Sequence, residues 1–272
     1  MKMKNQNLNQ CSEEHLEFLR KRKKMIFKVR FLQISILVIS LVVWEVLSRL
    51  NIIDSFIVSS PSRIMDTIIS LYCAGQLWNN LMFTVLETVA GFILGTVLGM
   101  IIATLIWWST FIFKVSEPYL VVLNALPKVA LGPIIIVWMG AGMGSIILMA
   151  LLVSVVISIM NILHGFENVS KEKILLMKSF GATKMQIFQK LVLPSNISTI
   201  VSTLKINVGM SLIGVITGEF LVSANGIGYL IVYGGQVFKM DLVMAGVFIL
   251  AMLAWGMYAC VARVEHRYSN KS

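Results

Sequence analysis

Ionisable and amide side chains inside long apolar runs are the residues of this sequence that could do chemistry. Five of them fall within such runs: Glu87, Asn124, Lys128, Lys205 and Glu219. A charge is costly in the hydrocarbon layer, so residues of this kind typically face a cavity or a partner and mark a solute pathway. We therefore expect these five to form or support a translocation pathway. For Lys205 and Glu219, extension of the side chain to the nearer membrane surface is an equally good interpretation.

Arrangements typical of catalysis are missing from the sequence. Its three histidines and three cysteines are scattered, which argues against a metal site and a disulfide framework. It contains no Gly-x-x-x-x-Gly-Lys-Ser/Thr phosphate-binding loop, and no nucleophile–base pair stands out. We expect no enzyme activity, no metal and no cofactor on this chain.

The composition predicts a polytopic membrane protein. Hydrophobic residues make up 57% and charged residues 13%, where a soluble domain carries about a quarter charged residues. Several runs reach the ~20 apolar residues that a helix needs to cross a bilayer, and their continuity excludes a β-barrel. We predict an all-α fold with about six transmembrane helices, the third interrupted by Pro127 and Pro133. The six predicted transmembrane helices cover residues 31–50, 81–107, 119–139, 145–163, 197–220 and 242–261.

Basic residues predict the orientation, because they concentrate on the cytoplasmic side. Nine Lys and Arg residues precede residue 31, and five more lie within residues 171–190, whereas the opposite side would hold three. Both termini are then cytoplasmic, with a basic extension over residues 1–30 and a tail over residues 263–272. The net charge of +10 is thus a topology signal, and we expect no nucleic-acid partner.

A polar, basic loop over residues 164–194 separates the fourth and fifth spans. Apolar residues at helical spacing predict two short amphipathic helices. Gly181 suits the left-handed turn at the end of the first, and Pro194 is expected to stop the second. The apolar ridge of these helices fits the groove of a partner protein. The alternative is that the ridge folds back on the protein's own helices.

Glycines predict two further features. Gly91, Gly95, Gly99 and Ala103 place small residues on one face of the second helix, which lets helix backbones approach closely in lipid. Such a stripe is either an interface that slides during transport or static packing. The glycine-rich segment over residues 223–241, with apolar residues at its centre, is either a gate at the outer mouth or an interfacial loop.

Gly181, Leu193 and Pro194 fall at the positions of a known loop motif: Glu-Ala-Ala, three residues, Gly, nine residues, Ile, one residue, Leu-Pro. Leu191 stands in place of Ile, and Leu175-Leu176-Met177 replaces Glu-Ala-Ala. The loop thus resembles that of ABC importer permeases. Other pieces resemble the nitrate, sulfonate, taurine and thiamine-precursor branch: Trp44-Glu45-Val46-Leu47, Ser60-Pro61-Ser62, residues 125–133, residues 138–142, Gly218-Glu219-Phe220 and residues 225–229.

The resemblance covers about residues 37–267 and implies a type I ABC importer permease fold. The transmembrane permease domain would cover residues 31–262 in the bacterial cytoplasmic (inner) membrane. The implied partners are a cytoplasmic ATPase that carries ATP and magnesium, a second permease copy forming a homodimer, and an extracytoplasmic solute-binding protein. The implied ATPase-coupling residues are Ile174, Met177, Phe180, Gly181, Ala182, Met185, Phe188, Leu193 and Pro194.

The resemblance also narrows the solute. The branch carries small anions, such as sulfonates, taurine and nitrate, or thiamine precursors. Related permeases are expected to have a basic residue where this chain has Glu87, and this difference argues slightly against a strongly anionic solute. The alternative function is an ATP-independent secondary transporter or channel. It would predict inverted repeats, and the sequence has no convincing repeat.

Overall fold

The computed structural model describes residues 2–50 and 52–269. Every regular element within these ranges is helical, as the sequence predicts. The chain divides into two compact units, Met1–Met65 and Asp66–Ser272, and each is described by itself. Met1 of the predicted extension and residues 270–272 of the predicted tail lie outside the described residues.

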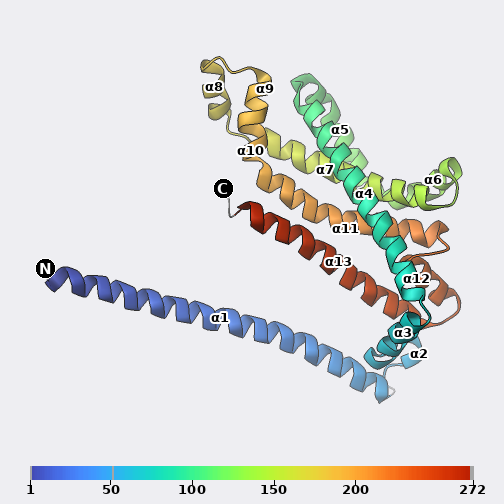
Figure 1. The fold of residues 1–272 in the computed structure, drawn as a ribbon. Helices are drawn as coiled ribbons and strands as arrows, with labels where there is room; N and C mark the ends of the chain where they lie inside the picture. The colour runs from blue at the N-terminus through green and yellow to red at the C-terminus, as the bar shows by residue number, and fades with distance from the viewer. Residues whose placement is uncertain (1, 51, 270–272) are drawn as a thin grey trace. The chain divides into compact units, whose positions relative to one another are not determined.

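The first unit consists of α1 (Lys2–Arg49), α2 (Ser55–Val58) and the start of α3 (Pro61–Cys73) (Figure 1). Helix α1 runs without a break through the predicted extension and the first predicted span. Glu45 ties its end to the start of α3. The Glu45 carboxylate accepts hydrogen bonds from the backbone N–H and the hydroxyl of Ser62 at 3.1 and 2.9 Å. Two sequence pieces that resemble the permease branch are therefore in contact.

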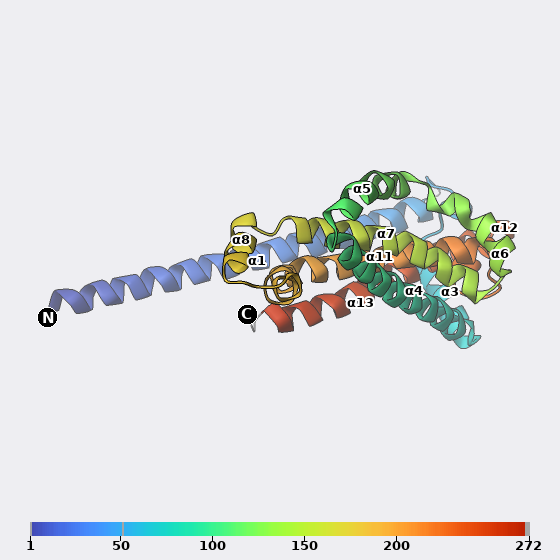
Figure 2. The same cartoon turned by 90° about the horizontal axis from the view of Figure 1, so that it is seen from above.

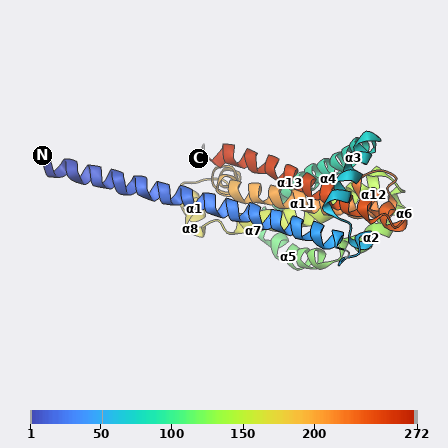
Figure 3. The same ribbon diagram turned by 90° about the horizontal axis from the view of Figure 1, so that it is seen from below.

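The second unit is a bundle of long helices with short helices at both ends (Figure 1). Its elements are the remainder of α3 and then α4 (Gln76–Trp107), α5 (Thr110–Ala125), η1 (Lys128–Leu131), α6 (Gly132–Met139), α7 (Met143–Glu167), α8 (Lys171–Ser179), α9 (Lys184–Ile187), η2 (Phe188–Val192), α10 (Leu193–Ser195), α11 (Ile197–Val222), α12 (Ile227–Gln236) and α13 (Met240–Ser269). Figures 2 and 3 show α8 at one end of this bundle and α6 and α12 at the other. We call these the loop end and the α12 end.

Five of the six predicted spans fall on single long helices, and the third falls across α5, η1 and α6. Within residues 2–50 and 52–269, five helical segments are long and apolar enough to cross a membrane: Arg20–Arg49, Gln76–Trp107, Met143–Glu167, Ile197–Val222 and Met240–Arg263. A sixth span exists if α5 and the helices after it count as one. The chain bends by 85° between Thr110–Ala125 and Lys128–Met139.

The bend has a local cause at Pro127. The preceding residue, Leu126, is extended, with φ −63° and ψ 133°, because a residue before proline avoids the helical conformation. Pro133 was expected to interrupt the span as well, and this is wrong. It lies in the first turn of α6, where its missing N–H costs no hydrogen bond, so it begins a helix instead.

Three helices, α4, α7 and α11, pack so closely that side chains larger than those present would not fit between them. A Cβ at Gly91 would overlap the side chain of Ala150, and one at Gly214 would lie 2.5 Å from the Cα of Ala150. In the middle of this seam, the side-chain amide of Asn207 donates to the hydroxyls of Thr96 and Ser158 at 2.9 and 2.5 Å. The predicted glycine stripe is therefore a helix-packing surface.

A Gly214→Ala substitution should lower the stability of this seam by about 1–3 kcal/mol, the range for overpacking. The obstacle is backbone, the Cα of Ala150, and it cannot rotate away. Gly209→Ala on the same helix is the matched control, because nothing lies within 4 Å of its Cβ position. Thermal unfolding of both purified variants in one detergent should show a lower Tm for Gly214→Ala alone. Equal Tm values would contradict the close packing.

Candidate functional site

The loop between α7 and α11 folds into short helices whose ends are set by local sequence. Thr183 and Gln186 form a reciprocal capping box at the start of α9. Gly181 has φ +75°, and the N–H of Ala182 reaches the carbonyl of Met177 at 3.0 Å, as at a glycine-terminated helix. The prediction of two helices joined by a glycine turn is confirmed.

Pro194 does not stop the second helix. The chain continues from α9 through the π-helical turn η2 into α10, where Pro194 lies in the first turn. The helical path is interrupted two residues later, at Asn196, with φ −107° and ψ 9°. Helix α11 then begins at Ile197.

Part of the predicted ridge packs onto the protein's own core. Ile174, Met177, Ala182 and Phe188 are partly buried against a cluster that includes Phe166 and Val192. This is the folding back that the sequence left open as an alternative, and it applies to one side of the ridge. Of the other predicted coupling residues, Gly181 and Pro194 are exposed and Leu193 is half-buried.

Lys184 and a group of aromatic rings fasten the loop to α4 and α7. The ammonium of Lys184 donates to the carbonyl of Trp108 at 2.6 Å and lies 5.3 Å from the centre of the Trp107 ring, within cation–π range. The rings of Trp107, Phe166 and Phe188 have their centroids 5.2 to 6.3 Å apart, a favourable spacing for aromatic pairs. The loop is therefore held to both helices by side chains.

Four other apolar side chains of the loop are exposed. They are Leu175, Leu176, Phe180 and Met185, and they are 68, 57, 79 and 50% exposed. We call them the apolar loop patch. Phe180 and Met185 were predicted as coupling residues, and the two leucines were not. Their sequence signal is the replacement of Glu-Ala-Ala by apolar residues.

The predicted pathway residues lie in three places. Glu87 on α4 and Glu219 on α11 are buried, at 2% and 1% exposed, and Glu219 accepts from the hydroxyl of Thr84, one turn before Glu87 on α4. Lys128 and Asn124 lie at the 85° bend, and the ammonium of Lys128 donates to the carbonyl of Asn124 at 3.1 Å. Lys205 is half-buried on α11, 14 residues before Glu219.

The start of α12 is held by side chains of α4 and α11. The side-chain oxygens of Asn80 and Thr84 accept from the N–H groups of Gly226 and Ile227 at 2.8 and 2.9 Å. Glu219 accepts from the next N–H along at 2.5 Å. The first N–H groups of a helix have no partner within the helix, so these buried side chains satisfy them. They thereby determine where the segment over residues 223–241 sits.

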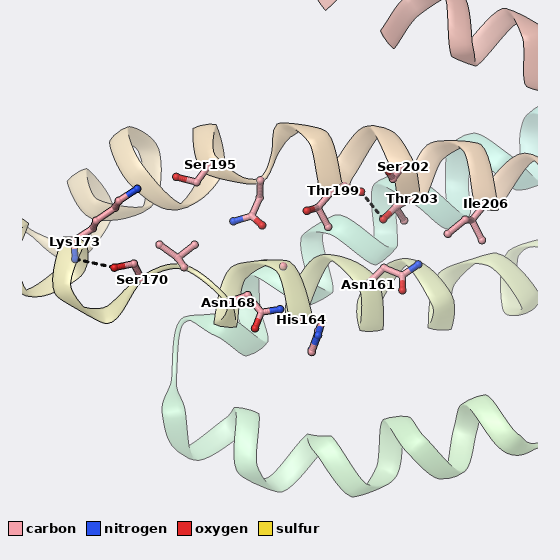
Figure 4. A pocket seen from close by; sticks show the side chains of 13 residues that line it. Asn161, His164, Asn168, Ser170, Lys173, Ser195, Thr199, Ser202, Thr203 and Ile206 are labelled. Carbon is pink, nitrogen blue, oxygen red and sulfur yellow. Dashed lines mark hydrogen bonds between the residues drawn. The ribbon is translucent and has the colours of Figure 1, made fainter. Parts of the chain in front are cut away.

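A polar cavity of about 590 Å³ opens between α7 and α11 near the loop end (Figure 4). Its polar lining residues are Asn161, His164, Asn168, Ser170, Lys173, Ser195, Asn196, Thr199, Ser202 and Thr203. None of them was predicted as a site residue. Their signal is polar residues recurring at helical spacing along one face of each apolar helix. Amides, hydroxyls and a lysine are suited to hydrogen-bonding a small polar or anionic solute.

Three relatives align along most of the chain. The probable ABC transporter permease of Haemophilus influenzae is 29% identical over 89% of this chain and 98% of its own length. The formylaminopyrimidine transport permease ThiX of Halalkalibacterium halodurans is 28% identical over 83% and 90%. The taurine permease TauC of Escherichia coli is more distant, at 22% over 82% and 83%.

Two solved importer structures share the fold. The inward-facing MetNI methionine ABC transporter matches with a TM-score of 0.60 at 17% identity, over 67% of this chain and 91% of that chain. A bacterial ABC transporter that imports the acidic polysaccharide alginate matches with a TM-score of 0.62 at 15% identity, over 74% and 83%.

The family model described as the inner membrane component of binding-protein-dependent transport systems matches residues 95–270, more than half of the chain. Its span includes the loop, the seam helices α7 and α11, and the α12 end. This chain therefore belongs to the family of inner-membrane permease components of binding-protein-dependent ABC importers.

Proposed function

We propose that this chain couples solute passage across the membrane to a separate ATPase, and that the apolar loop patch is the surface on which the ATPase docks. The observation that carries the proposal is four exposed apolar side chains on a loop that is fastened to α4 and α7 by other side chains. Apolar surface rimmed by polar residues marks an interaction site. Lysines throughout the loop favour a groove with an acidic rim.

The roles of this chain and of its partners follow from this docking. ATP and magnesium bind to the partner, and this chain has no catalytic role of its own. The loop over residues 164–194 and both termini face the cytoplasm, in keeping with the basic residues concentrated there. A second copy of the chain completes the pathway as a homodimer, and an extracytoplasmic binding protein delivers the solute. The family assignment supports this set of partners.

The contacts at the loop end explain how a movement of the docked ATPase is transmitted to the helices of the pathway. The hydrogen bond from Lys184 to Trp108 and the packing of Phe188 join the loop to the ends of α4 and α7. A displaced loop would carry these helices with it as a rigid body, the kind of switch between packed states that transporters use. Because ATP then binds the two states with different affinity, solute binding and ATP binding are linked reciprocally.

The proposed solute is a small anion, such as a sulfonate, taurine or nitrate, or a thiamine precursor. The relatives named for formylaminopyrimidine and taurine support this class. So does the polar cavity at the loop end, whose amides, hydroxyls and Lys173 offer hydrogen-bond donors. Lys128 at the exposed bend adds a positive charge.

A Phe180→Ala variant should bind the ATPase about 30-fold more weakly, because truncating an aromatic residue that dominates an interface costs about 2 kcal/mol. Phe180 is 79% exposed, so its loss should leave the fold intact. Gln189→Ala, an exposed position of the same loop outside the apolar loop patch, is the matched control. Titration of the purified ATPase onto each variant in lipid nanodiscs measures the effect. Equal affinities for the two variants would remove the patch from the docking surface.

A Lys128→Gln variant should raise the KM for an anionic solute roughly tenfold, the effect of losing one charged hydrogen bond of about 1.5 kcal/mol. It should leave the KM for a neutral thiamine precursor unchanged. Lys114→Gln is the control, since Lys114 is an exposed lysine of the same bent span. ATP-driven uptake into proteoliposomes containing the complete importer gives both values. An unchanged KM for every anion tested would exclude Lys128 from the pathway.

A further inference from the structure

The polar cavity near the loop end is built from three helices and carries a positive charge. It has a volume of about 590 Å³ and lies between the last turns of α7, the first turn of α8 and the first turns of α11 (Figure 4). Such a volume is typical of small-molecule sites, which hold about 300–1,000 Å³. Lys173 is one of the 13 lining residues, and none of them is an aspartate or a glutamate. The cavity is therefore better suited to an anion than to a cation.

Two acidic residues are close to the cavity in the sequence. Glu167, the last residue of α7, lines a different cavity between α5 and α7. The carboxylate of Glu172 accepts from the hydroxyl of Ser170 at the rim. Within the part of the chain that the structure describes, no carboxylate is within salt-bridge distance of the Lys173 ammonium, and the side chain extends toward Ser195 (Figure 4). The ammonium is therefore available to an anion.

Most polar side chains of the cavity have hydrogen-bonding capacity left for a ligand. Figure 4 shows two hydrogen bonds among the lining residues, and each has a backbone atom at one end. They join the N–H of Lys173 to the hydroxyl of Ser170, and the hydroxyl of Thr203 to the carbonyl of Thr199. Ammonium, amide and hydroxyl groups are donors. Among the described residues, the lining side chains without a hydrogen bond to protein are those of Asn161, His164, Asn168, Lys173, Ser195, Thr199 and Ser202.

The N-terminus of α11 adds a partial positive charge to the same cavity. Asn196 precedes α11 and is 4% exposed, and its side-chain amide donates to the carbonyl of Val192. This side chain therefore does not cap the first N–H groups of the 26-residue helix. Uncapped N–H groups and the helix dipole attract anions. Ser195, Asn196 and Thr199 line the cavity, so the helix end and the ammonium of Lys173 act on the same space.

We propose that this cavity binds a small oxyanion, such as a sulfonate, sulfate or phosphate group, and that the bound anion joins the loop to α11. Lys173 neutralises the anion from α8, and the hydroxyls of Thr199 and Ser202 donate to it from α11. The amides of Asn161 and Asn168 donate from α7. Three helices that meet at the base of the loop then share one ligand.

Sharing this ligand gives the anion control over the loop. A ligand shifts an equilibrium toward the state that it binds better, so an anion that bridges α8 and α11 favours the loop position of this structure. With the loop end in the cytoplasm, the site meets anions that have already crossed the membrane. The inference rests on the proposed function for the anionic class of solute, and it gives this class a site on the cytoplasmic side.

Equilibrium binding of radiolabelled sulfate to the full chain in phosphatidylcholine nanodiscs tests the site, with chloride holding the ionic strength constant. We expect saturable binding of one sulfate per chain, with competition by methanesulfonate. Lys173→Gln should weaken the affinity about tenfold, the effect of losing one charged hydrogen bond. Lys171→Gln is the matched control and should bind as the wild type does, because Lys171 is an exposed lysine of the same helix outside the cavity.

Ser202→Asp and Ser202→Asn form a second pair of variants, equal in size and different in charge. Ser202 is an exposed position of α11 at the cavity, so both side chains fit. The aspartate should abolish measurable sulfate binding by charge repulsion, whereas the asparagine should retain it. Equal binding by the two variants would contradict an anion at this position.

The effect on the loop is measured by the distance between spin labels at Ser179→Cys on α8 and Ile213→Cys on α11, both exposed positions. The background replaces Cys11, Cys73 and Cys260 with serine. Saturating sulfate should narrow the distance distribution in this background and have no effect after Lys173→Gln. A distribution that sulfate leaves unchanged would overturn the joining of the loop to α11.

Two further comparisons identify the source of the oxyanion and separate the site from the proposed function. If a lipid headgroup supplies it, phosphatidylglycerol in the nanodiscs should lower the sulfate affinity of the wild type but not of Lys173→Gln. If a free anion does, both affinities should stay unchanged. A wild-type chain without saturable sulfate binding in either lipid would overturn the site, and anion uptake by the complete importer would still support the proposed solute. Binding without uptake of any anion would leave the site and exclude that solute.

Discussion

The close approach of α4, α7 and α11 is the constraint on which the rest of the second unit depends. In lipid, apolar side chains gain no hydrophobic free energy by exchanging contact with hydrocarbon tails for contact with one another. Helices therefore associate by close packing and by interhelical hydrogen bonds. Both are present here, in the contact of Gly91 and Gly214 with Ala150 and in the hydrogen bonds of Asn207 to Thr96 and Ser158. Three helices joined so tightly are expected to move together.

The two ends of this seam are attached to their neighbours by different chemistry. At the loop end, aromatic rings and the ammonium of Lys184 join the loop to α4 and α7. At the α12 end, buried oxygens of Asn80, Thr84 and Glu219 accept the first N–H groups of α12. The difference has a physical basis. A short helix that begins within the membrane domain has no water for its N–H groups, so protein side chains must supply acceptors.

Features that depend on local sequence could be predicted well. The spans follow from runs of about 20 apolar residues, and the loop turn follows from Gly181, whose φ of +75° suits glycine best. The 85° bend at Pro127 could be located in the sequence, but its angle depends on how α6 packs. Pro194 and Pro133 were expected to break helices, and both lie in first turns, where proline is tolerated.

Features that depend on tertiary contacts could not be predicted. Spacing alone does not tell which side of the loop ridge packs against Phe166. The sequence therefore could not show that Ile174 and Met177 are partly buried while Phe180 and Met185 are exposed. Thr84 and Glu219, in direct hydrogen bond, are 135 positions apart in the sequence. The polar cavity between α7 and α11 likewise requires two helices to be placed side by side. In each case the residue types could be interpreted from the sequence, but the residues that they contact could not be identified from it.

We propose that a separate ATPase docks on the apolar loop patch. A photo-crosslinking amino acid at position 180, activated in the native membrane, tests it most directly, and position 189 on the same loop provides the comparison. We expect a covalent adduct between position 180 and an ATP-binding subunit, identified by mass spectrometry, and little or none from position 189. Adducts of position 180 only with lipid, or only with this chain itself, would contradict it.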